Sequence, residues 1–268
     1  MIKDITIGQY VPGESFIHKL DPRTKIIISL LFIINLFIVN NFYGYIFVVL
    51  FLGIVISVSK LPLKYLYKGV RGVFVLILIT AVLNLFMVPG SADTLLFKWN
   101  FITIYEEGVN TAVFMALRLI LLIMGTSVLT LTTSPIELTD AIERLLNPFK
   151  KIGVPAHELA MMMTIALRFI PTLMDETDKI MKAQKARGAD FESGGLIKKA
   201  KSLIPLLVPL FISSFRRADE LAMAMEARCY RGGEGRTRMK KLIFTGRDVI
   251  AFGVFAILMG ISIALRFI

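Results

Sequence analysis

The chain has 268 residues, of which 56% are hydrophobic, and its mean hydropathy is +0.71. A soluble domain is nearer about 45–50% apolar, so the composition excludes an ordinary soluble domain and indicates an integral membrane protein. The formal charge of +11 comes from 31 basic and 20 acidic residues. Since the basic residues lie between and after apolar runs, they favour an anionic membrane face over nucleic acid as the partner.

Five apolar runs have the length or composition of membrane helices. The first is short for a full span unless its helix begins near Thr24, with the Lys25 side chain extending to the interface. An uncharged Asn40-Asn41 turn joins it to the second run as a helical hairpin. The polar first 25 residues lack the pattern of a cleavable signal peptide. The runs are residues 26–39, 43–58, 70–88, 109–131 and 249–268.

The distribution of basic residues predicts the orientation of these spans. Residues 60–71 carry four basic residues and no acid, whereas residues 91–108 carry three acids and one base. Residues 132–247 hold 20 basic and 13 acidic residues. Placing both basic regions inside gives a cytoplasmic N-terminus, an external C-terminus and five spans. We therefore expect a multi-pass protein of the cell (plasma) membrane.

Two shorter apolar runs leave the number of spans open. Residues 159–174 and 203–215 are both interrupted by proline, and the first also contains Arg168. Counting them as spans gives seven helices but moves residues 175–201, with seven basic residues, to the outside. The positive-inside rule argues against that arrangement. Five spans are preferred, with long helices that start at the membrane boundary and project into the cytoplasm.

Three helical pieces are expected between residues 132 and 247. In the first, residues 134–149, Ser134 is the expected N-cap and Glu137 completes a capping box. The second, residues 155–187, is expected to kink or restart at Pro171. The third, residues 196–231, passes through two prolines.

The third piece ends in the most distinctive stretch, Arg216–Arg231, which reads RRADELAMAMEARCYR. Its small residues and methionines allow the close approach of a partner helix. The second piece ends similarly, and the pattern D-x4-A-x2-A-R recurs at an offset of 41 residues, with Arg187 matched to Arg228. Two interpretations are open. Each arginine caps its helix, worth about 0.3–1 kcal/mol, or each pairs with a carboxylate on a partner. The recurrence favours docking.

The sequence contains no recognisable motif for nucleotide binding, metal binding or catalysis. There is no G-x-x-x-x-G-K-[ST] motif, and the glycine-rich residues 232–237 lack its lysine, so ATP hydrolysis by this chain alone is not expected. His18 and His157 have no metal-ligand spacing, and the single Cys229 excludes an intrachain disulfide. We expect no catalytic residue, no metal and no cofactor. Arg118 within the fourth run either lines a pathway or binds a neighbouring subunit, or it lies off the bilayer centre and its side chain extends to the interface.

Three segments of the chain belong together: FIHKLDPRTK at residues 16–25, Ala-Arg-Gly at residues 186–188 and RADELAMAMEARCY at residues 217–230. Together they resemble a known family, the transmembrane T component of energy-coupling factor (ECF) transporters. The resemblance covers nearly the full chain. It implies an all-α integral membrane protein with about five transmembrane helices and long cytoplasmic coupling helices. The implied regions are a four-span membrane region (residues 1–131), the coupling helices (132–247) and a C-terminal transmembrane helix (248–268).

The resemblance also implies partners and site residues. The T component joins two ABC-type ATPase subunits to a membrane S component that binds a vitamin or other micronutrient, within the lipid bilayer and without nucleic acid. The ATPases carry the ATPase activity, so this chain is not expected to be an enzyme. The implied ATPase-docking residues are Ala186, Arg187, Gly188, Ala227, Arg228 and Cys229. Supporting positions on the coupling helix are Asp219, Glu220, Ala222, Glu226 and Arg231.

The second motif departs from the family pattern at Cys229, which replaces glycine. Because cysteine resists positive φ, the conformation of this helix end is where a difference is expected. A stand-alone secondary transporter is the alternative function, and it predicts polar groups at mid-membrane and inverted repeats. An intramembrane enzyme is another, and it needs a catalytic set. Neither pattern is convincing in the sequence.

Overall fold

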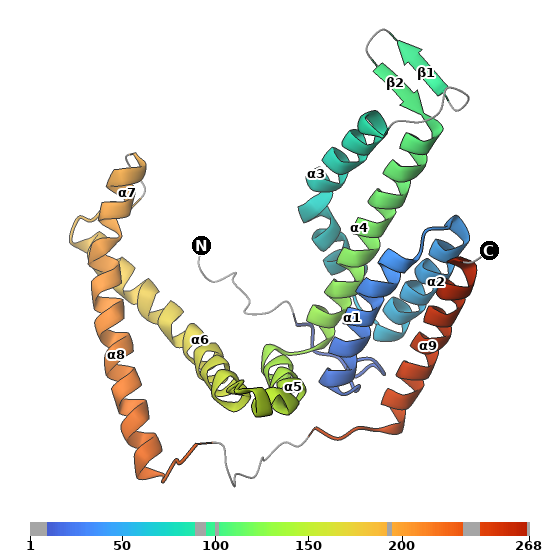
Figure 1. The fold of residues 1–268 in the computed structure, drawn as a ribbon. Coiled ribbons are helices and arrows are strands. Elements are labelled where there is room, and N and C mark those ends of the chain that lie inside the picture. The colour runs from blue at the N-terminus through green and yellow to red at the C-terminus, as the bar shows by residue number, and fades with distance from the viewer. Residues whose placement is uncertain (1–9, 89–94, 100–101, 192–194, 233–241, 267–268) are drawn as a thin grey trace. The chain divides into compact units, whose positions relative to one another are not determined.

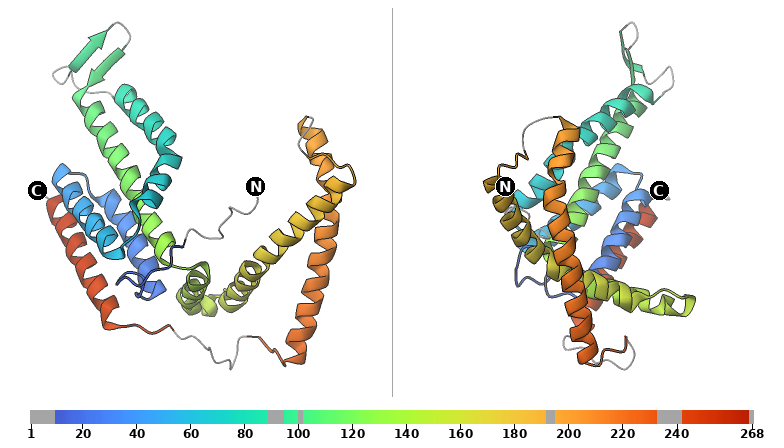
Figure 2. Two further views of the ribbon diagram at one scale, coloured as in Figure 1. Left: turned by 180° about the vertical axis from the view of Figure 1, so that it is seen from behind. Right: turned by 90° about the vertical axis from the view of Figure 1, so that its left-hand side faces the viewer.

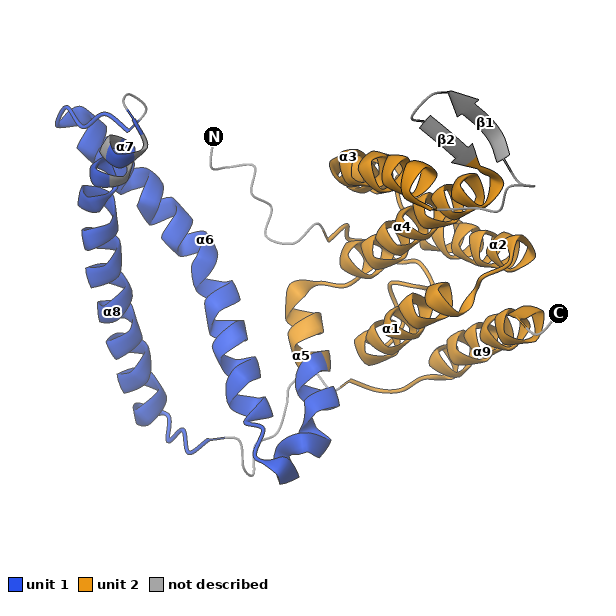
Figure 3. Cartoon of the chain, turned by 45° about the horizontal axis from the view of Figure 1, so that its top comes forward, with its two compact units in different colours: residues 1–7, 142–241 blue, residues 8–141, 242–268 orange. Residues whose placement is uncertain are grey.

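The structure, a computed structural model, describes residues 10–88, 95–99, 102–191, 195–232 and 242–266. The chain forms two compact units (Figure 3). One, here called the membrane unit, comprises residues 8–141 and 242–268. The other, the long-helix unit, contains residues 142–241.

Five long helices build the membrane unit (Figure 1). All but the first are long and apolar enough to cross a membrane. The first has 17 residues, about 26 Å of helix, which is the lower end of the length that spans a bilayer. The helices are α1 (Pro22–Ile38), α2 (Phe42–Ser59), α3 (Leu63–Met87), α4 (Glu106–Thr132) and α9 (Gly246–Arg266). An all-α membrane protein is thus confirmed.

The directions of α1 and α9 follow from hydrogen bonds at both of their ends. At their N-terminal ends, the Asp21 backbone N–H donates to Asp248 Oδ1 over 2.9 Å. At the other end, Asn41 Nδ2 donates to the Leu265 carbonyl over 2.7 Å. The two helices therefore run parallel, although more than 200 residues separate them in the chain.

The core of the membrane unit lies between α1, α2, α4 and α9. Its fully buried members include Leu36, Val48, Leu131 and Phe255. At Gly125 on α4 a Cβ would lie 2.5 Å from the Phe32 ring, so glycine permits the close approach of α1. α3 packs along α4 and leaves most of its apolar side chains exposed, as expected of a helix that faces lipid.

The structure differs from the expectations in two places, at the start of the third span and within residues 91–108. The third span begins at Leu63 and not near residue 70, so that its first turns include three of the four basic residues of the 60–71 segment, Lys64, Lys68 and Arg71. Within residues 91–108 there is a short antiparallel hairpin, β1 (Leu95–Trp99) paired with β2 (Ile102–Tyr105), which the sequence analysis missed. Aromatic and β-branched residues favour such strands.

Arg118 on α4 is held by other helices of the same unit. Its Nε donates to the Tyr45 hydroxyl over 3.1 Å, and a terminal nitrogen donates to the Val39 carbonyl over 3.4 Å. Its guanidinium carbon also lies 5.2 Å from the centre of the Phe37 ring. These partners lie close to the α1–α2 turn, whereas Arg118 itself lies at the middle of α4.

The long-helix unit begins within α5 (Pro135–Leu146) and continues through the 3₁₀ helix η2 (Asn147–Ile152). The Glu137 N–H donates to Ser134 Oγ over 3.3 Å, which confirms the predicted N-cap. α6 (Ala156–Ala186) runs without interruption through Pro171, so the restart considered from the sequence does not occur.

The expected third piece is two helices, α7 (Leu196–Ser202) and α8 (Ile204–Ala227). The break falls at Leu203, because Pro205 lies in the first turn of α8. Proline has no N–H to donate to a preceding turn, and it is well suited to begin a helix. Figure 2 shows the chain leaving α6, passing through α7 and returning along α8.

Candidate docking site at two helix ends

The C-terminus of α6 is closed by a Schellman motif. Arg187 is the C-cap, and Gly188 follows it with a φ of +88°. The Gly188 N–H donates to the Lys185 carbonyl, and the Ala189 N–H to the Gln184 carbonyl, each over 3.0 Å. These bonds satisfy carbonyls that the helix itself leaves without partners, and the left-handed position is the one glycine occupies most readily.

The C-terminus of α8 has the same geometry with a different residue. Arg228 is the C-cap, and Cys229 follows it with a φ of +58°. The Cys229 N–H donates to the Glu226 carbonyl over 2.8 Å, and the Tyr230 N–H to the Met225 carbonyl over 3.0 Å. The expected difference in conformation at Cys229 is therefore wrong. The cysteine adopts the left-handed conformation, because the hydrogen bonds of the motif and the contacts of Tyr230 offset its steric cost.

Both C-cap arginines are exposed. Within the part of the chain that the structure describes, no hydrogen bond or ion pair engages the guanidinium of Arg187 or Arg228. A guanidinium presents a planar set of donors that matches a carboxylate in two parallel hydrogen bonds. Each helix end thus offers a charged, directional group that no described residue of the chain engages.

α6 and α8 are antiparallel, which places the two ends at opposite extremes of the pair. Arg217 donates to Glu176 Oε2 over 2.8 Å, and the Tyr230 hydroxyl donates to Met161 Sδ over 3.0 Å. Arg187 follows Glu176 by eleven residues, and Arg228 follows Arg217 by the same number. The two arginines are therefore placed symmetrically about the Glu176–Arg217 contact.

The five supporting positions lie on α8 and just beyond it. Their side chains are exposed. Ala222 and Glu226 also line a groove of about 530 Å³ between α6 and α8, together with Phe169 and Tyr230. The other three supporting residues, Asp219, Glu220 and Arg231, do not line this groove.

The structure adds two residues to the site that the sequence analysis did not single out. Glu176 belongs to α6 and contacts Arg217, and Tyr230 reaches back from the α8 end to α6. Arg217 and Tyr230 both stand inside the stretch that resembles the T component. The sequence signal was thus present, but only the antiparallel arrangement reveals their partners.

The two histidines make contacts within the chain. His18 Nδ1 lies 2.6 Å from Ser15 Oγ, and its Nε2 donates to the Val11 carbonyl over 3.0 Å. His157 Nδ1 lies 3.0 Å from Glu143 Oε1. Among the described residues there is no group of three or more side chains that could hold a metal ion.

Comparison with known proteins places the chain in a family. The CbiQ family model, described as "Cobalt transport protein", matches residues 13–239. The energy-coupling factor transporter transmembrane protein EcfT of Clostridium kluyveri is 71% identical over 266 residues, which are 99% of this chain and 98% of that protein. Proteins of the same name from Thermosediminibacter oceani and Bacillus subtilis are 59% and 51% identical, and the alignments cover 100% and 92% of this chain and 100% and 93% of theirs.

The apolar helices and these relatives define a multi-pass membrane component of a transport system. The chain belongs to the CbiQ family, among the EcfT transmembrane components of energy-coupling factor transporters.

Proposed function

We propose that this chain is the coupling subunit through which two ABC-type ATPase subunits drive uptake of a vitamin or other micronutrient. In this proposal the substrate is bound by a separate membrane S component, and ATP is hydrolysed only by the partners. Residues 132–247 lie on the cytoplasmic side, where the ATPases dock, and the N-terminus is cytoplasmic in the plasma membrane.

One observation carries the proposal. Two exposed arginines, Arg187 and Arg228, occupy the same C-cap position of the same motif at opposite ends of an antiparallel helix pair. Such a symmetric pair suits two equivalent acceptors, one on each subunit of an ATPase dimer. The docking residues are Ala186, Arg187 and Gly188 at one end and Ala227, Arg228 and Cys229 at the other.

The geometry suggests how movement is passed on. When ATP binding closes the two ATPases, the docked helix ends move together. α6 and α8 respond as one body, because they pack along each other and are joined by the Glu176–Arg217 and Tyr230–Met161 contacts. The movement of this helix pair reaches the membrane helices and tilts the S component, which exposes or releases its substrate.

The test is ATP-driven uptake by proteoliposomes that contain this chain, both ATPases and the S component. Each charge-assisted contact is worth about 1.5–3 kcal/mol, so Arg187→Ala with Arg228→Ala is expected to weaken ATPase association by about a hundredfold or more and abolish uptake. Arg216→Ala, an exposed arginine on α8, is the matched control and keeps full uptake. Full uptake by the double variant, inserted at the normal level, overturns the docking assignment.

The orientation has a separate test. Cys229 is the single cysteine and is exposed. A membrane-impermeant thiol reagent is expected to label it in inside-out vesicles and not in sealed right-side-out vesicles. Labelling from the external side contradicts a cytoplasmic long-helix unit.

A further inference from the structure

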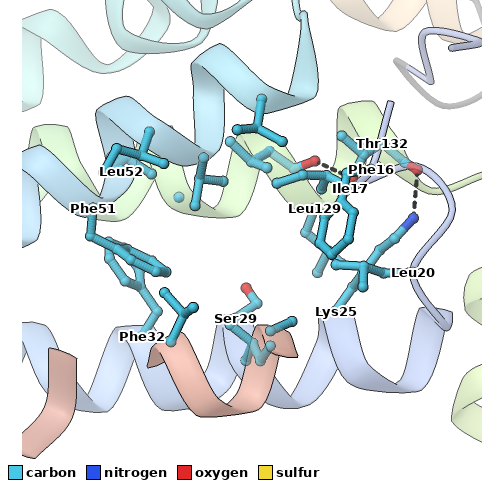
Figure 4. A pocket seen from close by; sticks show the side chains of 18 of the residues that line it. Phe16, Ile17, Leu20, Lys25, Ser29, Phe32, Phe51, Leu52, Leu129 and Thr132 are labelled. Carbon is cyan, nitrogen blue, oxygen red and sulfur yellow. Dashed lines mark hydrogen bonds between the residues drawn. The ribbon is translucent and has the colours of Figure 1, made fainter. Parts of the chain in front are cut away.

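The segment FIHKLDPRTK holds a buried lysine that caps the end of another helix. α4 ends at Thr132, and its last carbonyls have no partners within the helix. Lys25 Nζ donates to the Thr132 carbonyl over 2.9 Å, as the dashed line in Figure 4 shows. The Val11 N–H donates to the adjacent Leu131 carbonyl, also over 2.9 Å. A positive charge at this position also complements the helix dipole.

Lys25 is fixed to its own segment as well as to α4. A second N–H of its ammonium group donates to the His18 carbonyl over 3.0 Å, and only 7% of the residue is exposed. Burial of an ammonium group is costly unless its donors are satisfied. An apolar side chain at this position would fill the space without that cost, but it would remove the hydrogen bond from residue 25 to the Thr132 carbonyl.

A buried carboxylate performs the corresponding role at the start of α9. Asp248 is fully buried and accepts three hydrogen bonds. Its Oδ2 accepts from the Thr245 backbone N–H and from the Thr245 hydroxyl, both over 2.8 Å. Its Oδ1 accepts from the Asp21 N–H, which belongs to the N-cap of α1. A carboxylate suits this position because both of its oxygens accept, whereas the nitrogen of an amide, in either orientation, would face a backbone N–H that also donates.

Among the described residues, the contacts of Lys25 and Asp248 lie close to the two places where the chain leaves the membrane unit and returns to it. It leaves the membrane unit through α5, shortly after Thr132, and returns to it just before Thr245. Both places are bonded to one short segment, residues 18–25, the first through Lys25 and the second through Asp21. Residues 18–25 therefore join the C-terminus of α4 and the N-terminus of α9 to the start of α1.

We propose that Lys25 and Asp248 are positioning residues that hold both connections of the long-helix unit to a single point of the membrane unit. The inference goes beyond the proposed function, although its effect on transport rests on it. If either connection is released, movement of the long helices is absorbed at the loosened connection. ATP hydrolysis then continues, but less substrate is moved for each ATP.

The first measurement does not depend on the partners. Hydrogen exchange of the purified full chain compares Lys25→Met and Asp248→Asn with Lys19→Met, whose side chain is exposed and paired with Glu14. We expect exchange about tenfold or more faster near residues 129–133 in the first variant and near 245–248 in the second, with α6 and α8 unchanged. Unchanged exchange at these helix ends, or an increase spread over the whole chain, overturns the proposal that Lys25 and Asp248 hold the two connections.

The second measurement uses the complete transporter at equal yield of assembled complex. Both variants are expected to keep ATP hydrolysis and to lose severalfold in substrate moved per ATP, whereas Lys25→Arg, which keeps a charged donor, retains most of it. A role in stability alone predicts less complex with an unchanged ratio, and that result contradicts positioning. If the unaltered complex shows no ATP-driven uptake, the proposed function fails. The hydrogen-exchange data alone then decide whether Lys25 and Asp248 hold the two connections.

Discussion

The ends of α6 and α8 have one geometry built from two different residues. At α6, Gly188 takes the left-handed position at no steric cost, and Ala189 follows it. At α8, Cys229 takes that position, and Tyr230 follows with its hydroxyl 3.0 Å from Met161 on α6. The comparison shows that a tertiary contact just beyond a helix can hold a residue that its own preference would exclude.

The largest expected effect concerns the equivalence of the two ends. If both arginines dock to equivalent ATPases, then Arg187→Ala and Arg228→Ala alone each lower ATP-driven uptake by about tenfold or more, to a similar extent. The uptake assay with purified components measures this. A variant with normal uptake at one end shows that the ends are not equivalent and that docking is one-sided.

Substitution of Gly188 is expected to destabilise its helix end more than substitution of Cys229 at the end of α8. Gly188→Val places a β-branched side chain at a φ of +88° and costs about 1–2 kcal/mol in the last turn of α6. Faster hydrogen exchange of the backbone near residues 187–189 measures the loss. Gly195→Ala, at an exposed glycine outside the left-handed region, is the control and leaves exchange at the α6 end unchanged.

Cys229→Gly removes the conformational cost at the α8 end. The folded end gains because glycine accepts a φ of +58° freely, and the more flexible unfolded chain offsets part of that gain. We expect slower exchange near residues 228–230 and a net stabilisation of about 0.5–1 kcal/mol, with uptake unchanged. Weaker protection at this end would mean that Cys229 contributes a favourable contact there.

The smallest effect is expected at the contact midway between the ends. The Glu176 and Arg217 side chains are 23% and 32% exposed, and a partly exposed pair contributes only about 0.2–1 kcal/mol. A double-mutant cycle with Glu176→Ala and Arg217→Ala measures this coupling. Exchanging the two residues is expected to restore the coupling energy. A coupling energy of zero would show that this contact does not help to hold α6 and α8 together.

Local sequence signals predicted the local features of this fold. Ser134 and Glu137 identified the start of α5, and the apolar runs identified the four helices that can cross a membrane. The hairpin of β1 and β2 was missed, because residues 91–108 were judged by their acidic charge and the apolar stretch within them is too short to span a membrane. A kink or restart was expected at Pro171, and α6 continues through it without a restart.

Features that depend on distant residues were not predictable. The sequence marked Arg187 and Arg228, but not that their helices are antiparallel or that Glu176 meets Arg217. It left Arg118 with two interpretations, because Tyr45 and Val39 lie more than 70 residues away. The left-handed Cys229 depends on hydrogen bonds and contacts that only the folded unit supplies.

The central claim is that both helix ends contact ATPases, and the single native cysteine gives it a direct test. A photo-crosslinker attached to Cys229 in the assembled transporter is expected to join this chain to an ATPase subunit. A Cys229→Ser chain that carries Gly188→Cys moves the probe to the α6 end, and the same partner class is expected there. Crosslinks to the S component alone, or none to an ATPase from either end, would contradict the account.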